Sequence, residues 1–264
     1  MERKIALVTG GSSGIGLCAA KALSAAGCRV YIISRRDFAC EGLTHISADV
    51  TDEQAVHDAV EEILMESGRI DILVNCAGFG ISGAIEFTEL ADAKRQMDVN
   101  FFGTVNTTKA VLGHMRRAGS GRIVNVSSVA APAAIPFQAF YSASKAAIND
   151  YTCALANEVR PYGVSVCAVM PGDIRTGFTD ARKKSEAGDS AYGGRIARSV
   201  ARMEQDERGG MAPETAGAYV AKIALKKKVK PLYAIGFSYK CACFLCDALP
   251  CGPRNWIIGK LYSS

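Results

Sequence analysis

Residues 9–16 read TGGSSGIG, and they stand between a short apolar run, Lys4–Val8, and a helical pattern, Ile15–Ala26. Glycines allow a tight turn and let the backbone come close to a pyrophosphate, while the start of the following helix offers free N–H groups. Glycine pairs also occur in ordinary turns, but this strand–turn–helix context favours a dinucleotide site. The residues that we expect to bind the dinucleotide are Gly10, Ser12, Ser13, Gly14, Ile15 and Gly16.

Strand and helix patterns alternate along the rest of the chain. They predict an α/β fold of the Rossmann type, a doubly wound parallel sheet of about seven strands with helices on both faces. The expected strands are Lys4–Val8, Arg29–Ser34, His45–Ala48, Ile70–Asn75, Arg122–Ser127, Val164–Val169 and Leu232–Ile235, and the expected helices are Ile15–Ala26, Asp52–Glu66, Thr88–Met115, Ser142–Val159 and Pro213–Leu225. We expect residues 1–264 to form a single domain, in which residues 173–212 (the covering segment) lie over the ligand and residues 237–264 (the C-terminal tail) are apolar.

The composition suits one packed core, since 49% of the 264 residues are hydrophobic and 22% are charged. The net charge is +5, but the basic residues form no dense stripe with interleaved aromatics, so we expect no nucleic acid partner. The first residues run directly into a strand pattern without the apolar region of a signal peptide, and most of the ten cysteines are scattered. We therefore expect a reducing, cytoplasmic location.

The end of the second expected strand, Ser34-Arg35-Arg36-Asp37, bears on the choice of dinucleotide. An acidic residue at this place binds the adenosine ribose of NAD, whereas arginine suits the extra phosphate of NADP. Because guanidinium groups make bidentate, charge-assisted bonds to phosphate, Arg35 and Arg36 predict NADP(H). The alternative is that both arginines are surface charges and that Asp37 holds a ribose.

Tyr141 and Lys145 are four residues apart at the start of an expected helix, which places both side chains on one face. Free tyrosine has a pKa of about 10, too high for an efficient base, and a neighbouring ammonium would lower it. Ser128 ends a strand thirteen positions earlier, Asn75-Cys76-Ala77-Gly78 follows another strand, and Asn100 lies in the long expected helix. None of the three histidines stands beside a nucleophile elbow, which argues against a Ser-His-Asp hydrolase.

Together with the TGGSSGIG turn, this ordered set resembles the short-chain dehydrogenase/reductase family. The resemblance implies an NADP(H)-dependent enzyme that interconverts a secondary alcohol and a ketone, with Tyr141 as general acid in reduction and base in oxidation. It implies that Lys145 lowers the pKa of Tyr141 and binds the nicotinamide ribose, and that Ser128 binds the reacting oxygen. Asn100 would anchor a water that links Lys145 to solvent, although its residue type alone favours a helix kink with a locally satisfied amide.

The same resemblance implies further cofactor contacts. Asp49 and Val50 match a pair that contacts adenine, and Asn75, Ala77 and Gly78 belong to the matching Asn-[Asn/Cys]-Ala-Gly turn. The motif Pro-Gly-x-Ile-x-Thr, whose backbone and threonine meet the nicotinamide carboxamide, is matched by Pro171, Gly172, Ile174 and Thr176. A plain Pro-Gly turn is the alternative there. The resemblance also implies a homodimer or homotetramer.

The connection between Ser128 and Tyr141 is almost wholly apolar, and Phe79, Gly80 and Ile81 extend the same wall. Such a lining favours an apolar substrate, and the resemblance extends to NADP-dependent hydroxysteroid dehydrogenases. We expect a hydroxysteroid or bile acid, whose carboxylate would pair with a basic residue of the covering segment. The alternatives are a retinoid or another lipid or small carbonyl compound and, in a different class, a non-catalytic dinucleotide-binding regulator.

The C-terminal tail combines aromatic residues with Cys241, Cys243, Cys246 and Cys251. Their spacing, C-x-C-x2-C-x4-C, differs from the paired C-x2-C of familiar zinc sites, so we expect no metal. We expect an apolar helix that packs on the substrate pocket, on another subunit or on a membrane surface. Lys240 and Lys260 beside the aromatics leave peripheral membrane contact open.

Overall fold

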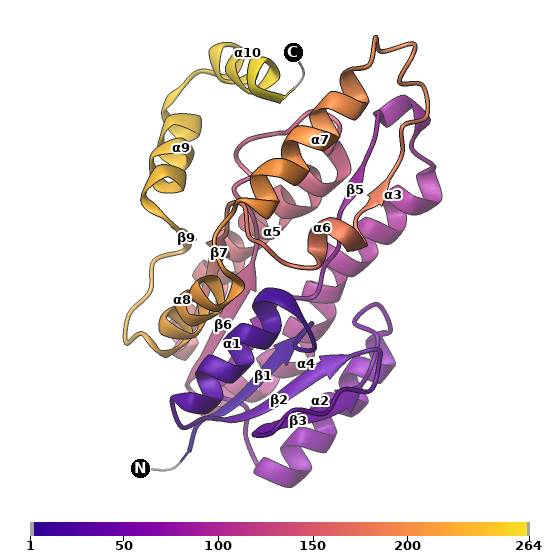
Figure 1. Cartoon of the computed structure of the whole chain (residues 1–264). Helices are drawn as coiled ribbons and strands as arrows, with labels where there is room; N and C mark the ends of the chain where they lie inside the picture. The colour runs from indigo at the N-terminus through magenta and orange to yellow at the C-terminus, as the bar shows by residue number, and fades with distance from the viewer. Residues whose placement is uncertain (1–2, 263–264) are drawn as a thin grey trace.

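The computed structural model describes residues 3–262, which build a seven-stranded parallel sheet in the order β3-β2-β1-β4-β6-β7-β9 (Figure 1). The doubly wound sheet predicted from the sequence is confirmed. Its strands are β1 (Ile5–Thr9), β2 (Arg29–Ser34), β3 (Leu43–Ser47), β4 (Ile72–Asn75), β6 (Gly121–Val126), β7 (Val164–Met170) and β9 (Leu232–Ala234). The central strands are apolar and buried because helices cover both faces of the sheet.

Two layers of helices enclose this sheet and give it a core on each face. The core on one face is closed by α1 (Gly14–Ala25) and α8 (Pro213–Leu225). The core on the other face is closed by α2 (Glu53–Ser67), α4 (Gly103–Ala118) and α5 (Ala139–Val159). All strands run parallel, so their carboxyl ends meet at one edge, where ligands bind in such folds.

The prediction of one continuous helix over 88–115 is wrong. The chain forms α3 (Leu90–Met97), a π-helical segment Asp98–Phe102, and then α4. A single wider turn of this kind re-aims the side chains that it carries and is common at functional sites. The sequence pattern missed it because the apolar spacing continues through the segment.

The covering segment has more regular structure than its charged composition indicated. It forms α6 (Phe178–Ala181), β8 (Lys183–Lys184) and α7 (Arg195–Arg208). The two residues of β8 pair with β5 (Ile81–Ser82) in a second, two-stranded sheet. This pairing fixes the covering segment against the wall that follows β4.

The C-terminal tail forms two helices, α9 (Phe237–Ala248) and α10 (Cys251–Tyr262), which lie along one side of the molecule (Figure 1). Tyr239 and Cys243 face inward from α9, and Arg254 of α10 donates a 2.7 Å hydrogen bond to the carbonyl of Cys246. No helix within residues 3–262 is long and apolar enough to cross a membrane.

A buried polar network joins the ends of β4 and β6 to the helices beneath them. The Asn75 amide donates to Asn125 Oδ1 at 2.9 Å, and the Asn125 amide donates to Thr152 Oγ1 at 2.8 Å. Thr107 donates to Asn75 Oδ1 at 2.6 Å. Because these groups are shielded from water, each depends on its protein partner.

Replacing Asn125 by leucine should therefore lower the free energy of unfolding by roughly 2–4 kcal/mol, since Asn75 and Thr152 would each lose a buried hydrogen bond. Urea unfolding followed by circular dichroism measures this. The matched control is Asn157→Leu, the same exchange at an exposed position of α5, which should change the free energy by less than about 0.5 kcal/mol. Equal losses in the two variants would contradict the structural role of the network.

Candidate active site

The glycine turn between β1 and α1 leaves no room for side chains. Gly10 has a φ of +65°, and a Cβ added to it would lie 2.9 Å from the Ala77 backbone. A Cβ on Gly16 would lie 2.3 Å from the carbonyl oxygen of Gly10. Ser13 begins α1 without capping it through its side chain, within the part of the chain that is described, so the first N–H groups of the helix are left for another acceptor. A cradle of this form fits the pyrophosphate of a dinucleotide.

Thr9 ties this turn to the one after β4, and sequence reasoning missed it as a site residue. Its hydroxyl accepts hydrogen bonds from the backbone N–H groups of Cys76 and Ala77 at 3.1 and 3.3 Å. Asn75 was also predicted as a cofactor contact, and that contact stays a prediction. Its side-chain amide lies in the buried network described above, which leaves its backbone as the group available to a cofactor.

The region expected to hold the adenosine end lies at the carboxyl ends of β2 and β3. Arg35 and Arg36 are exposed there, and neither forms an ion pair with any described residue. Asp49 Oδ1 accepts hydrogen bonds from both the backbone N–H and the hydroxyl of Thr51. The Val50 side chain is buried against Gly103, which leaves its backbone as the group available to a base.

The predicted catalytic residues converge around Gly78. A Cβ on Gly78 would lie 3.1 Å from Asn100 Oδ1 and 3.6 Å from Lys145 Nζ. Lys145 Nζ is 5.8 Å from the centroid of the Tyr141 ring, and the Ser128 hydroxyl is near enough to the Tyr141 phenol to lower its pKa. The structure thus brings together all four residues from three separate elements.

Asn100 is fully buried in the π-helical segment, and its amide is satisfied locally. It accepts from the backbone N–H of Phe79 at 3.0 Å and donates to the Phe79 carbonyl and to Ser144 Oγ. Ser144 donates in turn to the carbonyl of Tyr141. Asn100 therefore lies in a helix irregularity with a locally satisfied amide, and it also lies beside Lys145. Its role in anchoring a water stays a prediction.

Burial sets the proton affinities of the central pair. It raises the pKa of Tyr141 to about 12, opposed chiefly by the hydrogen bond from Ser128. Burial also lowers the pKa of Lys145 to about 8. The Lys145 ammonium donates to the Val126 carbonyl at 2.9 Å, and its role in lowering the pKa of Tyr141 stays a prediction. A phenol with a raised pKa stays protonated near neutrality, as a proton donor must.

The Pro-Gly motif after β7 is held from two sides. The Pro171 carbonyl accepts from the Val129 N–H at 3.0 Å, and the Tyr239 ring packs on Gly172, where a Cβ would lie 2.2 Å from it. The side chain of Ile174 is part of the core, so only its backbone could contact a cofactor. Thr176 lies 3.7 Å from the place of a Cβ on Gly14, which brings the covering segment over the glycine turn.

Comparison with known proteins agrees with the fold. The family model described as short chain dehydrogenase matches residues 4–187. A 3-ketodihydrosphingosine reductase from Bacteroides thetaiotaomicron is 44% identical over 247 residues, which are 90% of this chain and 92% of the relative.

Solved structures give the same result. A short-chain dehydrogenase from Streptomyces avermitilis is 32% identical with a TM-score of 0.82, covering 91% of this chain and 90% of that one. A short-chain dehydrogenase from Burkholderia cenocepacia in complex with NADP is 25% identical with a TM-score of 0.78, covering 100% and 99%. Fold and site define an oxidoreductase that uses a nicotinamide dinucleotide on a small-molecule substrate. The chain belongs to the short-chain dehydrogenase/reductase family.

The lowered pKa of Lys145 predicts a pH limit for the reductive reaction. The ammonium is present below about pH 8 and lost above it, so kcat/KM for reduction should fall as the pH rises through that value. In a Lys145→Arg variant the charge persists to high pH, and this limb should disappear from the profile even if the rate is lower. If kcat/KM of the arginine variant still fell at the same pH, the fall would belong to a group other than Lys145.

Proposed function

We propose that the protein is an NADPH-dependent reductase of a long-chain ketone, of the chemical class represented by 3-ketodihydrosphingosine. The observation that carries the reaction type is the buried Tyr141 phenol, which stays protonated near neutrality, with Ser128 and Lys145 beside it. The substrate class rests on the relative that is 44% identical over almost the whole of both chains. A long-chain ketone also fits the apolar wall of residues 129–140 better than a sugar does.

When bound, the nicotinamide dinucleotide would supply the hydride for the carbonyl carbon. Ser128 donates to the carbonyl oxygen and orients it, and Tyr141 gives that oxygen its proton. Lys145 holds a positive charge near the developing negative charge, at 5.8 Å from the Tyr141 ring. The preference for NADPH is supported by Arg35 and Arg36, which are exposed at the end of β2 where the 2′-phosphate would lie.

The test is NADPH consumption by the purified protein with 3-ketodihydrosphingosine, a hydroxysteroid ketone, a retinal and an aldohexose. We expect the long-chain ketone to be reduced with the highest kcat/KM, and NADPH to be used in preference to NADH. Tyr141→Phe should lower kcat by at least about 100-fold, since it removes the proton donor.

Binding of NADPH, followed by its fluorescence, is the control for that variant and should be retained. Reduction of the steroid ketone in preference to the long-chain ketone would replace the proposed substrate class. Full activity in Tyr141→Phe would defeat the assignment of the proton donor.

We also propose that the outer face of the C-terminal tail binds an anionic lipid surface, from which such a substrate would come. Large apolar side chains of α9 and α10 are exposed, and the most exposed are Phe237, Phe244, Leu245, Trp256 and Leu261. Residues 237–264 carry Lys240, Arg254 and Lys260 against a single acidic residue, Asp247. Aromatic and basic groups together are typical of interfacial helices.

Flotation with phosphatidylglycerol vesicles tests this surface. A Phe244→Ser/Trp256→Ser variant should float markedly less than wild type, because both rings are exposed and their loss should not disturb packing. Met65→Ser, at an exposed apolar position on α2, is the control and should float as wild type does. Equal flotation, or a change in oligomer mass in its place, would assign the face to another role.

A further inference from the structure

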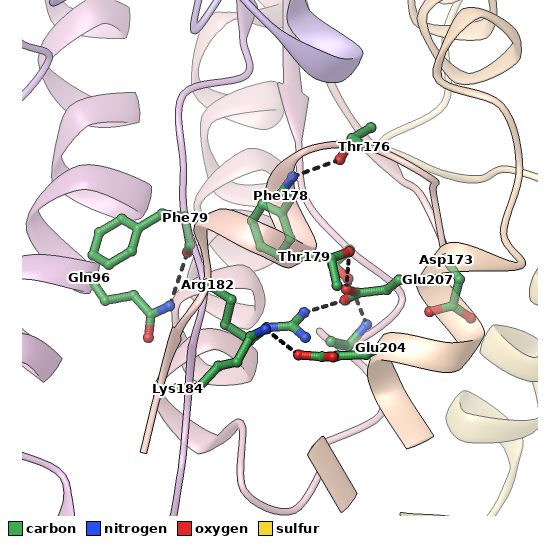
Figure 2. A network of polar contacts seen from close by, with 12 residues as sticks. Phe79, Gln96, Asp173, Thr176, Phe178, Thr179, Arg182, Lys184, Glu204 and Glu207 are labelled. Carbon is green, nitrogen blue, oxygen red and sulfur yellow. Dashed lines mark hydrogen bonds and ion pairs between the residues drawn. The ribbon is translucent and has the colours of Figure 1, made fainter. Parts of the chain in front are cut away.

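Arg182, between α6 and α7, has buried hydrogen-bond donors that nothing in the described chain satisfies. The residue is 4% exposed, and its Nη2 donates to Glu207 of α7 (Figure 2). The remaining donors, Nε and Nη1, have no hydrogen-bond partner among residues 3–262. Buried donors of a charged group without a partner are costly, and such groups in native proteins ordinarily meet an acceptor.

These donors lie one aromatic ring away from the proton donor. The Phe178 ring is 5.7 Å from the Tyr141 ring, and the guanidinium carbon of Arg182 is 5.5 Å from the Phe178 ring. The charges of Arg182 and Glu207 also reach Tyr141, since the first lowers and the second raises the pKa of that phenol. Phe178 therefore stands between the catalytic phenol and the guanidinium.

Phe178 and Arg182 both pack closely against Gly80. A Cβ on Gly80 would lie 3.0 Å from Phe178 Cζ and 3.3 Å from Arg182 Nε. The Phe178 ring thus packs beside both Tyr141 and Arg182. If the ring turns aside for a ketone at Tyr141, Arg182 Nε and Nη1 become donors within reach of the substrate.

The charge around Arg182 defines the kind of acceptor that fits. Glu207 already balances the guanidinium, and Glu207 Oε2 is itself occupied by the Thr179 hydroxyl at 2.6 Å. A substrate carboxylate would add a second negative charge at a site that the Glu207 side chain, 14% exposed, already neutralises. A hydroxyl oxygen accepts the two N–H groups without adding charge.

We propose that Arg182 Nε and Nη1 bind a hydroxyl oxygen of the substrate close to the reacting ketone, and so select hydroxyketones. The inference rests on the proposed reduction of a ketone and names a specificity-determining residue for it. Because Arg182 is already paired with Glu207, it is not the basic residue expected to pair with a substrate carboxylate.

The experiment compares two ketones within each enzyme, so that a partly unfolded variant does not distort the result. The pair is 3-ketodihydrosphingosine and its 1-deoxy analogue, and the readout is the ratio of their kcat/KM values with NADPH. Wild type should favour the hydroxylated ketone by about tenfold or more, the size expected for hydrogen bonds from a charged donor. The ratio should fall to near one in Arg182→Met/Glu207→Gln, which removes the donors without leaving a buried charge unpaired.

Arg182→Lys keeps a positive charge for Glu207 but lacks the two fixed donors, and its ratio should fall as well. Lys183→Met is the matched control, because Lys183 is the adjacent cation with an exposed side chain, and its ratio should equal that of wild type. A wild-type ratio retained in both Arg182 variants would overturn the inference.

A second pair, 1-hydroxy-2-decanone and 2-decanone, separates this inference from the proposed substrate class. If only the decanones are reduced, and the Arg182 variants lose the preference for the hydroxylated decanone, the role of Arg182 is supported and the sphingoid substrate is rejected. A preference that persists in the variants on every skeleton reduced rejects the role of Arg182 and leaves the substrate class standing. No reduction of any of the four ketones would overturn both proposals.

Discussion

The arrangement of the site depends on one buried charge, the ammonium of Lys145, which lies against the end of strand β6. Lys145 Nζ reaches the Val126 carbonyl of β6 at 2.9 Å, and little water remains to stabilise its charge. The neighbouring groups follow from this. A Cβ on Gly78 would press on the Asn100 amide oxygen at 3.1 Å, and Asn100 itself lies in the widened helical turn Asp98–Phe102.

Most of the architecture could be predicted from the apolar strand pattern and from the spacing of the motifs. Apolar runs located every strand of the large sheet, and Pro213–Leu225 was predicted with the bounds that α8 has, because proline marks its first turn. Helical spacing places Tyr141 and Lys145 on one face, whereas the link between Ser128 and Tyr141 came from the family resemblance. These features depend on local periodicity, which is visible in a single sequence.

The features that were missed depend on contacts between distant residues. Asn75 belongs to a recognisable turn, yet its partners Asn125 and Thr107 are far along the chain, and only their convergence turns its amide into the core. The π-helical segment interrupts the helix without a break in apolar spacing. The two-residue strands β5 and β8 are too short to leave a pattern, so the wall behind Phe178 could not be foreseen.

The C-terminal tail contacts the Gly172-Asp173 turn after β7. This contact connects the proposed lipid-binding surface of the tail with the proposed role of Arg182. Tyr239 of α9 donates to the Asp173 carboxylate at 2.6 Å, accepts from its backbone N–H, and stacks on Gly172. Burial raises the pKa of Asp173, so the contact lies in a poorly hydrated place where such bonds are strong. A few residues further on, the same segment carries Phe178 and Arg182. A shift of α9 on a lipid surface would thus act through Asp173 on the segment whose aromatic ring stands before Tyr141.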